Sequence, residues 1–418
     1  MPHLLLVTQV YLPDPASVGQ HMADSAEEMV RRGWQVTVLT SARGYDNPAQ
    51  VFPAHEKRNG VNIIRLPFSS FGKKTLVHRL SGQSLFCIQA ILRGLFLLKI
   101  DAILVTTSPP IGGLVGWFIS LLRRVPFHFW VMDLNPDQAI QQGIVSATSL
   151  PARVFDFINH RLLHRASTVI PMDHFMADRL AAKVPSSRSK MHIIAPWPME
   201  DSLEIIPKDD NPFIREHALE GKFLIMYSGN HSVVHPLDTI LEAALALQER
   251  TDLLFVFIGG GKGKAAIDKL LEEKAPRNIL SLPYQALDRI KYSLSAADIH
   301  LVSMGAPMVG CVHPCKFYGA MSLAKPILYL GPENSHIGEL LEEVEMGWQV
   351  NHGDPEMMIE TIKSISALPK EELLAYGQRG KAKIEAALSR QQLCETFCEI
   401  ISGTDSATSK ELRSSKHA

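Results

Sequence analysis

A lysine at the start of an amphipathic segment is the clearest sign of chemistry in this sequence. Lys316 follows His313 and Pro314 in VHPCKFYGAMSLAKP, and the proline predicts that a helix begins there. The helix dipole disfavours a cation in the first turn, so this placement of Lys316 indicates that an anion binds beside it. The alternative is a lysine that only extends into solvent. Lys316, His313 and Pro314 are therefore candidates for binding an anionic ligand.

Two glycine-containing turns could bind phosphate groups through their backbone N–H groups. Ser228, Gly229 and Asn230 follow the apolar run FLIMY and resemble a phosphate-binding turn without the Walker lysine. The second turn follows the run LLFVFI and contains three glycines and two lysines: Gly259, Gly260, Gly261, Lys262 and Lys264. Neither turn is the GxGxxG of a Rossmann unit with a later acid, so hydride transfer is not expected.

Two carboxylates and one more glycine follow the strands predicted in the first half. Asp133 and Asp137 come just after the apolar run FHFWVM, where side chains face the ligand edge of a parallel sheet. Asp137 is the better candidate for a helix cap, so Asp133 is the candidate catalytic carboxylate. Gly19 lies at the predicted start of the first helix, where it could approach a phosphate or an acceptor. An ordinary turn would explain Gly19 equally well.

Alternating strands and helices must position these residues. Short apolar runs alternate with amphipathic segments from the first residue, which is typical of βα units and a parallel sheet covered on both faces. The alternation stops at APWPMEDSLEIIPKDDNPF and resumes at FLIMYSG. The chain should therefore have an α/β fold with two doubly wound Rossmann-like domains facing across a cleft, because ligands bind at the carboxyl ends of such strands.

The same pattern predicts the domain boundaries. Residues 1–197 form the first Rossmann-like domain, and 198–213 form a linker rich in proline and acids. Residues 214–385 form the second domain, and 386–402 form a C-terminal helix that could return to pack on the first. Residues 403–418 lack apolar content and are expected to be disordered.

Composition excludes several classes of protein. With 42 Lys+Arg against 43 Asp+Glu, the chain offers no field for binding nucleic acid. Its five cysteines form no secreted framework in a chain of 418 residues. Cys311, His313 and Cys315 lack a second pair of zinc ligands, so neither a metal nor a cofactor is expected. The N-terminus reads as a strand without a leader, which favours a cytoplasmic location.

A basic and then apolar segment predicts contact with a membrane surface. Lys73, Lys74, His78 and Arg79 precede LSGQSLFCIQAILRGLFLLK. Arg93 interrupts this apolar segment, which falls short of the ~20 apolar residues that a spanning helix needs. Cations near an anionic leaflet support reversible binding, so the pattern predicts peripheral association at the inner face of the membrane. The alternative is a buried core helix that follows a solvated basic loop.

Nine short segments occur in an order that one enzyme family shares. From residue 4 to about residue 331 they are PDPASVGQHMADSAEEMVRRGWQVTVLT, TTSPPIGG, FWVMDLNPD, IIAPW, YSGN, FIGGGKGK, LPYQALDRI, SAADIHLVSM and HPCKFYGAMSLAKPILYLGP. Together they resemble glycosyltransferase family 4, the retaining enzymes of the GT-B fold. Within that family they are most similar to a branch with bacterial cell-surface polysaccharide transferases.

The resemblance implies a reaction and its partners. It implies transfer of a hexosyl or N-acetylhexosaminyl group from a nucleotide-sugar, most commonly a UDP-sugar, to a lipid-linked or glycan acceptor. It also implies retention at the anomeric carbon without a metal, with the acceptor on the first domain and the donor on the second. Carried over by position, the residues at the diphosphate, the base and the acceptor side are Gly19, Asp133, Ser228, Gly229, Asn230, Tyr284 and Ile290.

The sequence departs from the family pattern at the charged positions. The family's arginine and lysine after the YSG turn fall on Asn230 and His235, and its two glutamates fall on Cys311 and Gly319. We expect Lys316 to take over the contact with the diphosphate. Two other functions stay open here. A nucleotide-sugar epimerase shares this architecture but needs an acid and histidine set that has no clear place here, and a non-catalytic binding subunit would explain the missing glutamates.

Overall fold

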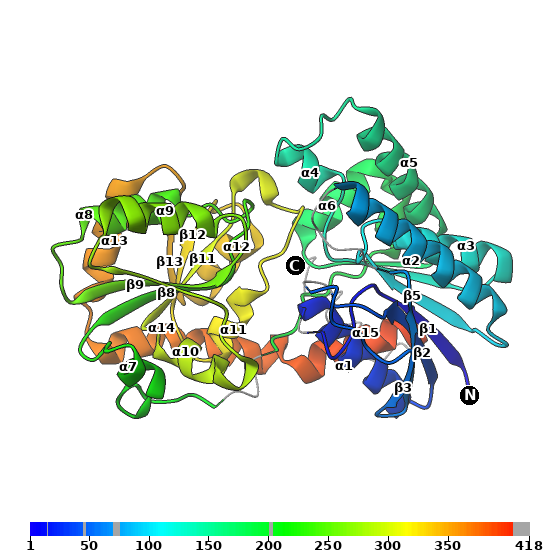
Figure 1. The fold of residues 1–418 in the computed structure, drawn as a ribbon, viewed down its shortest axis with the longest axis horizontal. Coiled ribbons are helices and arrows are strands. Elements are labelled where there is room, and N and C mark those ends of the chain that lie inside the picture. Colours follow the sequence, from blue (N-terminus) through cyan, green and yellow to red (C-terminus); the bar gives the residue numbers. More distant parts are fainter. Residues whose placement is uncertain (15, 45–46, 70–75, 200–203, 404–418) are drawn as a thin grey trace. The chain divides into compact units, whose positions relative to one another are not determined.

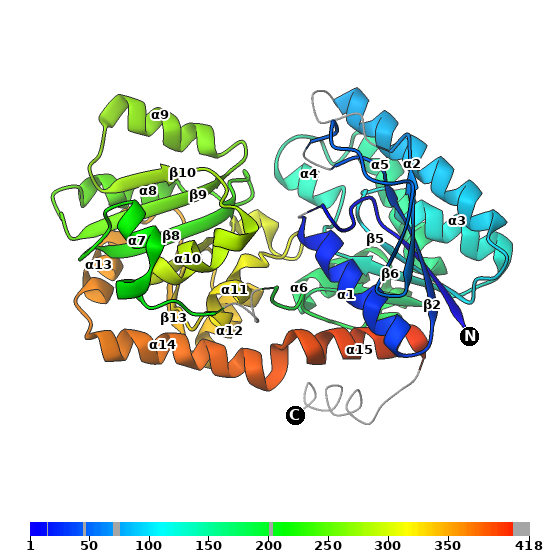
Figure 2. The same cartoon turned by 60° about the horizontal axis from the view of Figure 1, so that its bottom comes forward.

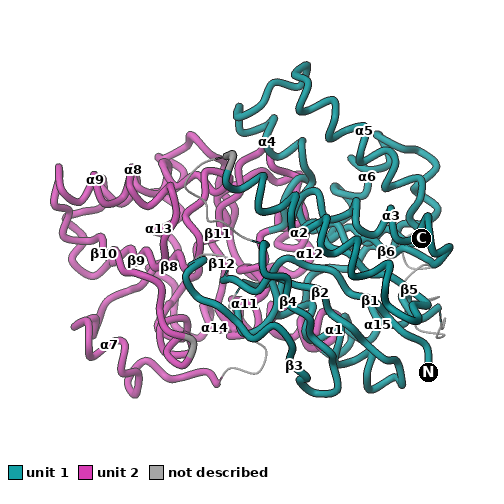
Figure 3. Tube along the Cα trace, turned by 45° about the vertical axis from the view of Figure 1, so that its right-hand side comes forward, with its two compact units in different colours: residues 1–197, 310–313, 391–418 teal, residues 198–309, 314–390 magenta. Residues whose placement is uncertain are grey.

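The chain folds into two compact units. The computed structural model describes residues 1–14, 16–44, 47–69, 76–199 and 204–403. The first unit comprises Met1–Trp197, Gly310–His313 and Gln391–Ala418, and the second comprises Pro198–Val309 and Pro314–Arg390 (Figure 3). Disorder is expected for residues 403–418, of which 404–418 fall outside the described residues, as do the lysines at 73 and 74.

Unit 1 is built on a seven-stranded sheet with the order β3-β4-β2-β1-β5-β6-β7 (Figure 1). All neighbouring strands are parallel except the β3–β4 pair. The strands are β1 (His3–Val7), β2 (Gln35–Ser41), β3 (His55–Arg58), β4 (Val61–Leu66), β5 (Ala102–Thr106), β6 (Phe127–Val131) and β7 (Thr168–Pro171). Every residue of β1, β5 and β6 is buried, as continuous apolar runs in a sheet covered on both faces require.

Helices cover both faces of this sheet. They are α1 (Ser17–Arg31), α2 (Leu76–Phe96), α3 (Gly113–Arg123), α4 (Asp137–Gln141), α5 (Leu150–Arg165), α6 (His174–Lys183) and α15 (Arg390–Ser402). Figure 2 shows α2, α3 and α5 on one side of the sheet, with α1 and α15 on the other. Two helices begin with a side-chain cap: Ser149 accepts a hydrogen bond from the amide of Ala152, and Asp173 accepts one from that of Met176.

The C-terminal helix belongs to unit 1, although it follows unit 2 in the chain. The ring centroid of Phe397 lies 4.6 Å from that of Trp130 and 5.9 Å from that of Trp197. Cys398 is buried, with its Sγ 3.6 Å from the carbonyl oxygen of Ser25 in α1. An aromatic cluster thus holds α15 against the sheet.

Unit 2 is built on a six-stranded parallel sheet with the order β10-β9-β8-β11-β12-β13. Its strands are β8 (Phe223–Asn230), β9 (Leu253–Gly260), β10 (Ile279–Leu282), β11 (Ile299–Ser303), β12 (Ile327–Leu330) and β13 (Gly347–Val350). Its helices are α7 (Pro212–Glu216), α8 (Asp238–Ala246), α9 (Lys264–Lys274), α10 (Ile290–Ala296), α11 (Lys316–Ser322), α12 (His336–Val344), α13 (Pro355–Ser366) and α14 (Lys370–Lys383).

The direction of the chain crossovers reverses between β8 and β11 in unit 2, and between β1 and β5 in unit 1. Ligands of doubly wound sheets bind at such reversal points, outside the carboxyl ends of the strands. The order in unit 2 is that of a Rossmann sheet, with β8 as its first strand. The fold thus predicts ligand sites at the loops after β8 and after β5.

Removing the central ring of the aromatic cluster should weaken unit 1. Phe397 is fully buried, and Phe397→Ala leaves a cavity against two tryptophans. We expect the free energy of unfolding, measured by urea titration with tryptophan fluorescence, to fall by about 3–5 kcal/mol. The control is Met357→Ala in α13, whose side chain is exposed and should change stability by less than about 0.5 kcal/mol. Equal unfolding midpoints would show that α15 adds nothing to the core.

Candidate functional site

The ends of β8 and β9 approach so closely that only glycine fits between them. A Cβ atom added to Gly259 would lie 1.9 Å from the carbonyl oxygen of Gly229. One added to Gly261 would lie 2.3 Å from the side-chain oxygen of Asn230. Gly229, Gly259 and Gly261 also have positive φ angles of 134°, 134° and 123°, which glycine adopts without strain. Both turns predicted from sequence thus form one glycine-lined edge of unit 2.

Lys316 reaches this edge from the start of α11. Its Nζ donates a hydrogen bond of 2.5 Å to Oη of Tyr227 and lies 3.8 Å from the centre of the Tyr227 ring. The Tyr227 hydroxyl in turn donates to the carbonyl oxygen of Asn230 at 2.8 Å. A Cβ atom on Gly229 would lie 3.3 Å from the Lys316 Nζ, so the ammonium group sits directly beside the turn. Tyr227 therefore orients Lys316 against the turn that we expect to bind phosphate.

Among the described contacts of the Lys316 ammonium group, none is with a carboxylate. Desolvation by the surrounding protein lowers the pKa of Lys316 to about 7, and the neighbouring Cys315 thiol opposes this shift. A desolvated cation without a counter-ion is typical of a functional site, because an anionic ligand relieves the electrostatic cost.

Two histidines near this lysine are neutral. His231 is buried beside the rings of Tyr227 and Phe257. Burial, reinforced by Lys316 and Lys264, lowers the pKa of His231 to about 4. Burial, again reinforced by Lys316, lowers the pKa of His235 to about 3. Nδ1 of His235 therefore carries the proton and donates to the carbonyl oxygen of Ser303 at 2.6 Å.

The other predicted donor-binding residues of unit 2 lie around the same edge. The Tyr284 hydroxyl donates to the Gly260 carbonyl oxygen at 3.3 Å, and its ring lies beside Gly260. Lys264 donates from Nζ to Ser281 and to the Leu282 carbonyl, both at 2.8 Å, so its charge is directed at β10. Three further predicted residues, Lys262, Ile290 and Pro314, make no hydrogen bond to Lys316 among the described contacts. Lys262 is exposed, and Ile290 begins α10. The carbonyl of Pro314 accepts a hydrogen bond from the Phe317 amide.

His313 has a contact within unit 1. Its Nδ1 lies 2.7 Å from Oδ2 of Asp173, and Gly310–His313 belongs to unit 1. The carbonyl of Cys311 accepts a hydrogen bond from the Leu134 amide at 2.8 Å, which fastens the same segment to unit 1. Asp173 thus both caps α6 and binds His313, a long-range contact that the local sequence around His313 does not reveal.

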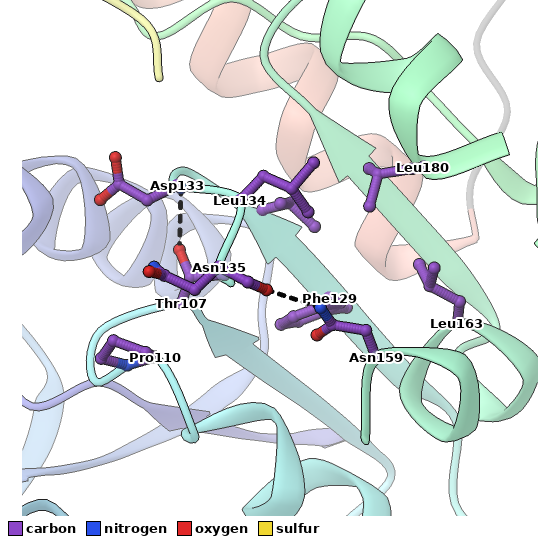
Figure 4. Close-up of a pocket in the computed structure, with 10 residues that line it drawn as sticks. Thr107, Pro110, Phe129, Asp133, Leu134, Asn135, Asn159, Leu163 and Leu180 are labelled. Atoms are coloured by element: carbon purple, nitrogen blue, oxygen red, sulfur yellow. Dashed lines mark hydrogen bonds between the residues drawn. The ribbon is translucent and has the colours of Figure 1, made fainter. Parts of the chain in front are cut away.

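In unit 1, Asp133 lies at the mouth of a small pocket (Figure 4). Oγ1 of Thr107 accepts hydrogen bonds from the amides of Met132 and Asp133, both at 3.1 Å, which fixes the turn. The Asp133 carboxylate points away from Leu134, and its side chain is exposed. The protein around the carboxylate nevertheless desolvates it and raises the pKa of Asp133 to about 6. Asp133 is thus suited to bind or accept a proton near neutral pH.

Its neighbour Asp137 has a structural contact. Oδ2 of Asp137 lies 2.9 Å from Nζ of Lys183, and Asp137 gives α4 no side-chain cap. The prediction that Asp137 caps a helix is therefore wrong, because the ion pair with α6 takes its carboxylate. Gly19 lies in the first turn of α1, where an added Cβ atom would lie 3.1 Å from Cα of Tyr11. The backbone of the loop before α1 thus packs against Gly19, and this contact alone explains a glycine at that position.

Sequence reasoning missed Tyr227 and Thr107. Tyr227 lies inside the apolar strand β8 and Thr107 follows β5. Both lie in segments of the family resemblance, YSGN and TTSPPIGG, but their residue types alone did not single them out. No group of three or more His, Cys, Asp or Glu residues that could hold a metal ion occurs in the described part of the chain.

Comparison with known proteins agrees with this geometry. Residues 17–197 match the glycosyl transferase 4-like domain family. The chain is 24% identical over 378 residues to the probable glycosyltransferase WbjE of Pseudomonas aeruginosa. This alignment covers 88% of this chain and 90% of WbjE. The chain is thus similar to family 4-like glycosyltransferases over most of its length. It is also 25% identical over 185 residues to the putative colanic acid biosynthesis glycosyl transferase WcaI of Escherichia coli K12. This alignment covers 44% of each protein.

The likeness to solved structures shows the fold of this glycosyltransferase. The structure of HepE from Anabaena with UDP and glucose superposes with a TM-score of 0.70 at 14% identity, covering 96% of this chain and 100% of HepE. The predicted GT-B fold with two Rossmann-like sheets is confirmed.

The close approach of the two glycine turns predicts that a side chain at Gly259 destabilises unit 2. Gly259→Ala forces a Cβ atom against the Gly229 carbonyl at a positive φ, so both overpacking and strain should destabilise unit 2 of the glycosyltransferase. We expect a loss of at least about 2 kcal/mol. Gly353→Ala is the matched control, because it also has a positive φ but nothing within 4 Å of an added Cβ atom, and it should cost about 1 kcal/mol. Thermal melts that rank the two variants equally would contradict the proposed crowding.

Proposed function

We propose that this glycosyltransferase moves a hexosyl or N-acetylhexosaminyl group from a UDP-sugar to a lipid-linked or glycan acceptor, with retention at the anomeric carbon. The observation that carries the proposal is Lys316, a desolvated cation held beside the glycine-lined edge of unit 2. The similarity to WcaI, a putative colanic acid biosynthesis glycosyl transferase, supports cell-surface polysaccharide synthesis. The similarity to HepE, whose structure contains UDP, supports a uridine nucleotide.

The donor diphosphate would bind at the turns after β8 and β9. There the backbone of Ser228, Gly229 and Asn230 approaches that of Gly260 and Gly261 without side chains in between. Lys316 supplies positive charge, and Tyr284 and Ile290 are proposed to contact the base. Because His231 and His235 are neutral at pH 7, Lys316 carries the electrostatic contact that the family's arginine and lysine would make.

The reaction needs stabilisation of the leaving group. The bond from the anomeric carbon to the β-phosphate oxygen breaks, and the acceptor oxygen bonds to the same face of that carbon. The acceptor proton passes to the departing phosphate, so no nucleophile from the enzyme is required. Negative charge grows on the diphosphate as the bond breaks, and Lys316 with the backbone N–H groups stabilises it. Asp133 is proposed to orient the acceptor hydroxyl, and we propose that no metal takes part.

The protein is proposed to act at the inner face of the cytoplasmic membrane, where lipid-linked acceptors are accessible from the cytoplasm. Among the described residues, no helix is long and apolar enough to cross a bilayer. A peripheral position would bring the enzyme to such an acceptor.

The decisive experiment is a thermal-shift screen with nucleotides, followed by transfer from the sugar nucleotide that binds. A ligand at a hundred times its dissociation constant raises the free energy of unfolding by about 2.7 kcal/mol, so binding will be visible. Release of UDP and labelled glycan, with the anomeric configuration read by NMR, would support the proposal. Free epimerised sugar without acceptor would point to an epimerase, and binding without turnover on any lipid-linked acceptor would point to a non-catalytic subunit.

Lys316→Ala should weaken donor binding and slow transfer together, because charge on the leaving group grows toward the transition state. Losing one charge-assisted contact should cost about 1.5–3 kcal/mol in UDP affinity measured by calorimetry. The control is Lys269→Ala on α9, an exposed lysine that pairs only with Glu273 in the described contacts. Unchanged affinity and turnover in a folded Lys316→Ala protein would move the assignment to Lys262 and Lys264.

We also expect Lys316 to take up a proton when the donor binds. The pKa of Lys316 is about 7 in the free protein, and a bound diphosphate should raise it because opposite charge favours the ammonium form. Affinity for UDP should therefore be highest below about pH 7 and fall as the pH rises. Calorimetry at about pH 8 in two buffers of different ionisation enthalpy should show close to one proton taken up, and Lys316→Ala should show none.

Asp133→Asn should lower turnover by about 10²-fold and change donor affinity little, because the carboxylate orients the acceptor hydroxyl in our proposal. With the pKa of Asp133 near 6, the parent enzyme should lose kcat/KM as the pH falls below about 6 and the carboxylate is protonated. The asparagine variant should lack this acidic limb. A variant that turns over at the parent rate would make Asp133 a structural residue only.

A further inference from the structure

The imidazole of His235 presents a hydrogen-bond acceptor in the loop that follows β8. A backbone carbonyl oxygen can only accept, so the contact of Nδ1 with the Ser303 carbonyl at 2.6 Å places a proton on Nδ1. Burial and the charge of Lys316 keep the ring neutral at pH 7. A neutral imidazole with its proton on Nδ1 has a lone pair on Nε2. Nε2 can therefore accept a hydrogen bond and cannot donate one.

This lone pair is available to a ligand. The side chain of His235 is partly exposed, and Nε2 is not one of the buried nitrogens that lack a partner. Among the hydrogen bonds of the described residues, the only one on this ring is that of Nδ1. The transfer mechanism proposed above uses His235 only as a residue without charge, so the acceptor on Nε2 has no role in it.

The loop holds the ring in a fixed direction. The Gly305 amide donates to the Val234 carbonyl at 3.0 Å, and the Ser303 hydroxyl donates to the Pro236 carbonyl. The residues on both sides of His235 are thus fastened to the segment at the end of β11, as is the ring itself. A side chain held in this way offers Nε2 at one position, and little conformational entropy is lost when a ligand binds there.

The order of the strands indicates which part of a UDP-sugar lies beside His235. Strands β10, β9, β8 and β11 are neighbours in this order (Figures 1 and 2). Tyr284 follows β10, Lys316 lies beside Gly229 at the end of β8, and His235 is bonded to Ser303 at the end of β11. A UDP-sugar runs from base through ribose and diphosphate to sugar. With its base at Tyr284 and its diphosphate at Gly229, the sugar extends toward β11.

The chemistry of Nε2 fits a sugar better than a phosphate. Diphosphate oxygens are acceptors at neutral pH, so one placed against Nε2 would bring two lone pairs together. A hexosyl group carries hydroxyl donors, and an N-acetylhexosaminyl group also carries an amide N–H donor. Either donor complements the neutral imidazole.

We propose that Nε2 of His235 accepts a hydrogen bond from a hydroxyl or acetamido N–H group of the donor sugar, and that His235 thereby helps to select this sugar. This inference rests on the proposed function, because it takes the diphosphate to bind beside Lys316. A buried acceptor that loses its partner is left unpaired, so a sugar without the matching donor group binds more weakly.

The test is calorimetry of the full chain with UDP, UDP-glucose and UDP-N-acetylglucosamine. His235→Asn keeps an N–H donor near the position of Nδ1 and removes the atom at Nε2. It should bind the UDP-sugar that the parent prefers about three- to tenfold more weakly, and UDP within about twofold of the parent. His235→Gln places an amide oxygen near the position of Nε2 and should recover part of the lost affinity.

The matched control is His217→Asn. His217 is a partly exposed histidine of unit 2 that follows α7 and precedes β8, so it lies toward the amino ends of the strands. Its variant should bind all three ligands as the parent does. If His235→Asn melts below the parent, His235→Gln and the sugar analogues described next decide the question.

Sugar analogues identify the group that Nε2 contacts. In deoxyfluoro analogues of UDP-glucose, a fluorine replaces one hydroxyl and cannot donate. One analogue should bind the parent about three- to tenfold more weakly than UDP-glucose does, yet bind His235→Asn as UDP-glucose does. A loss in His235→Asn that appears only with UDP-N-acetylglucosamine would assign the contact to the N–H group.

Two results would overturn the inference and leave the proposed function standing. One is an equal loss of affinity for UDP and for the UDP-sugars in His235→Asn, which would place the effect on the nucleotide or the loop. The other is a variant that binds every ligand and analogue as the parent does. A parent that binds neither UDP nor a UDP-sugar would reject the proposed function and this inference with it.

Discussion

The contact between the carboxyl ends of β8 and β9 constrains everything around it in unit 2. Gly229 and Gly259 pair in register, and the carbonyl of the first occupies the space where a side chain of the second would be. Two backbones this close leave N–H groups and carbonyls, not side chains, to line the strand ends. A polyanion can approach such a surface closely. The backbone of the strand ends has no net charge, so a cation that complements the polyanion has to come from another element of the unit. Lys316 does this from α11, with the Tyr227 hydroxyl and ring setting its direction.

The electrostatics of this edge follow from burial. The two nearby histidines lose their charge because desolvation penalises the protonated imidazole, and the lysine adds to that penalty. Lys316 itself is shifted in the same sense but keeps a pKa near neutrality. A carboxylate partner would stabilise the ammonium permanently, and it would also compete with a phosphate ligand. The positions where the family has glutamates hold Cys311 and Gly319 here, and neither residue supplies a carboxylate.

Much of this arrangement could be predicted from the sequence, and the reasons for the gaps are physical. Glycines after apolar runs and a lysine after a proline are local signals, so the turns and Lys316 were accessible to sequence reasoning. Tyr227 reads as one more apolar position of a buried strand, because the role of its hydroxyl depends on a residue 89 positions away. His313 is a candidate for the same ligand as Lys316 because it lies nearby in sequence. Its contact with Asp173, 140 residues away, is set by tertiary packing that no local pattern encodes.

The two faces of the unit 1 sheet show how a folding requirement differs from a functional one. A parallel sheet must be covered on both sides, so buried residues such as Phe86 of α2 and Phe397 of α15 are required by the core. On the side of α15 the cover is closed by an aromatic cluster that includes Trp130. On the side of α2 the core is equally complete, yet Leu92 and Phe157 lie outside it. Exposed apolar groups that align over three adjacent helices, amid a surplus of arginine, are therefore not explained by folding alone.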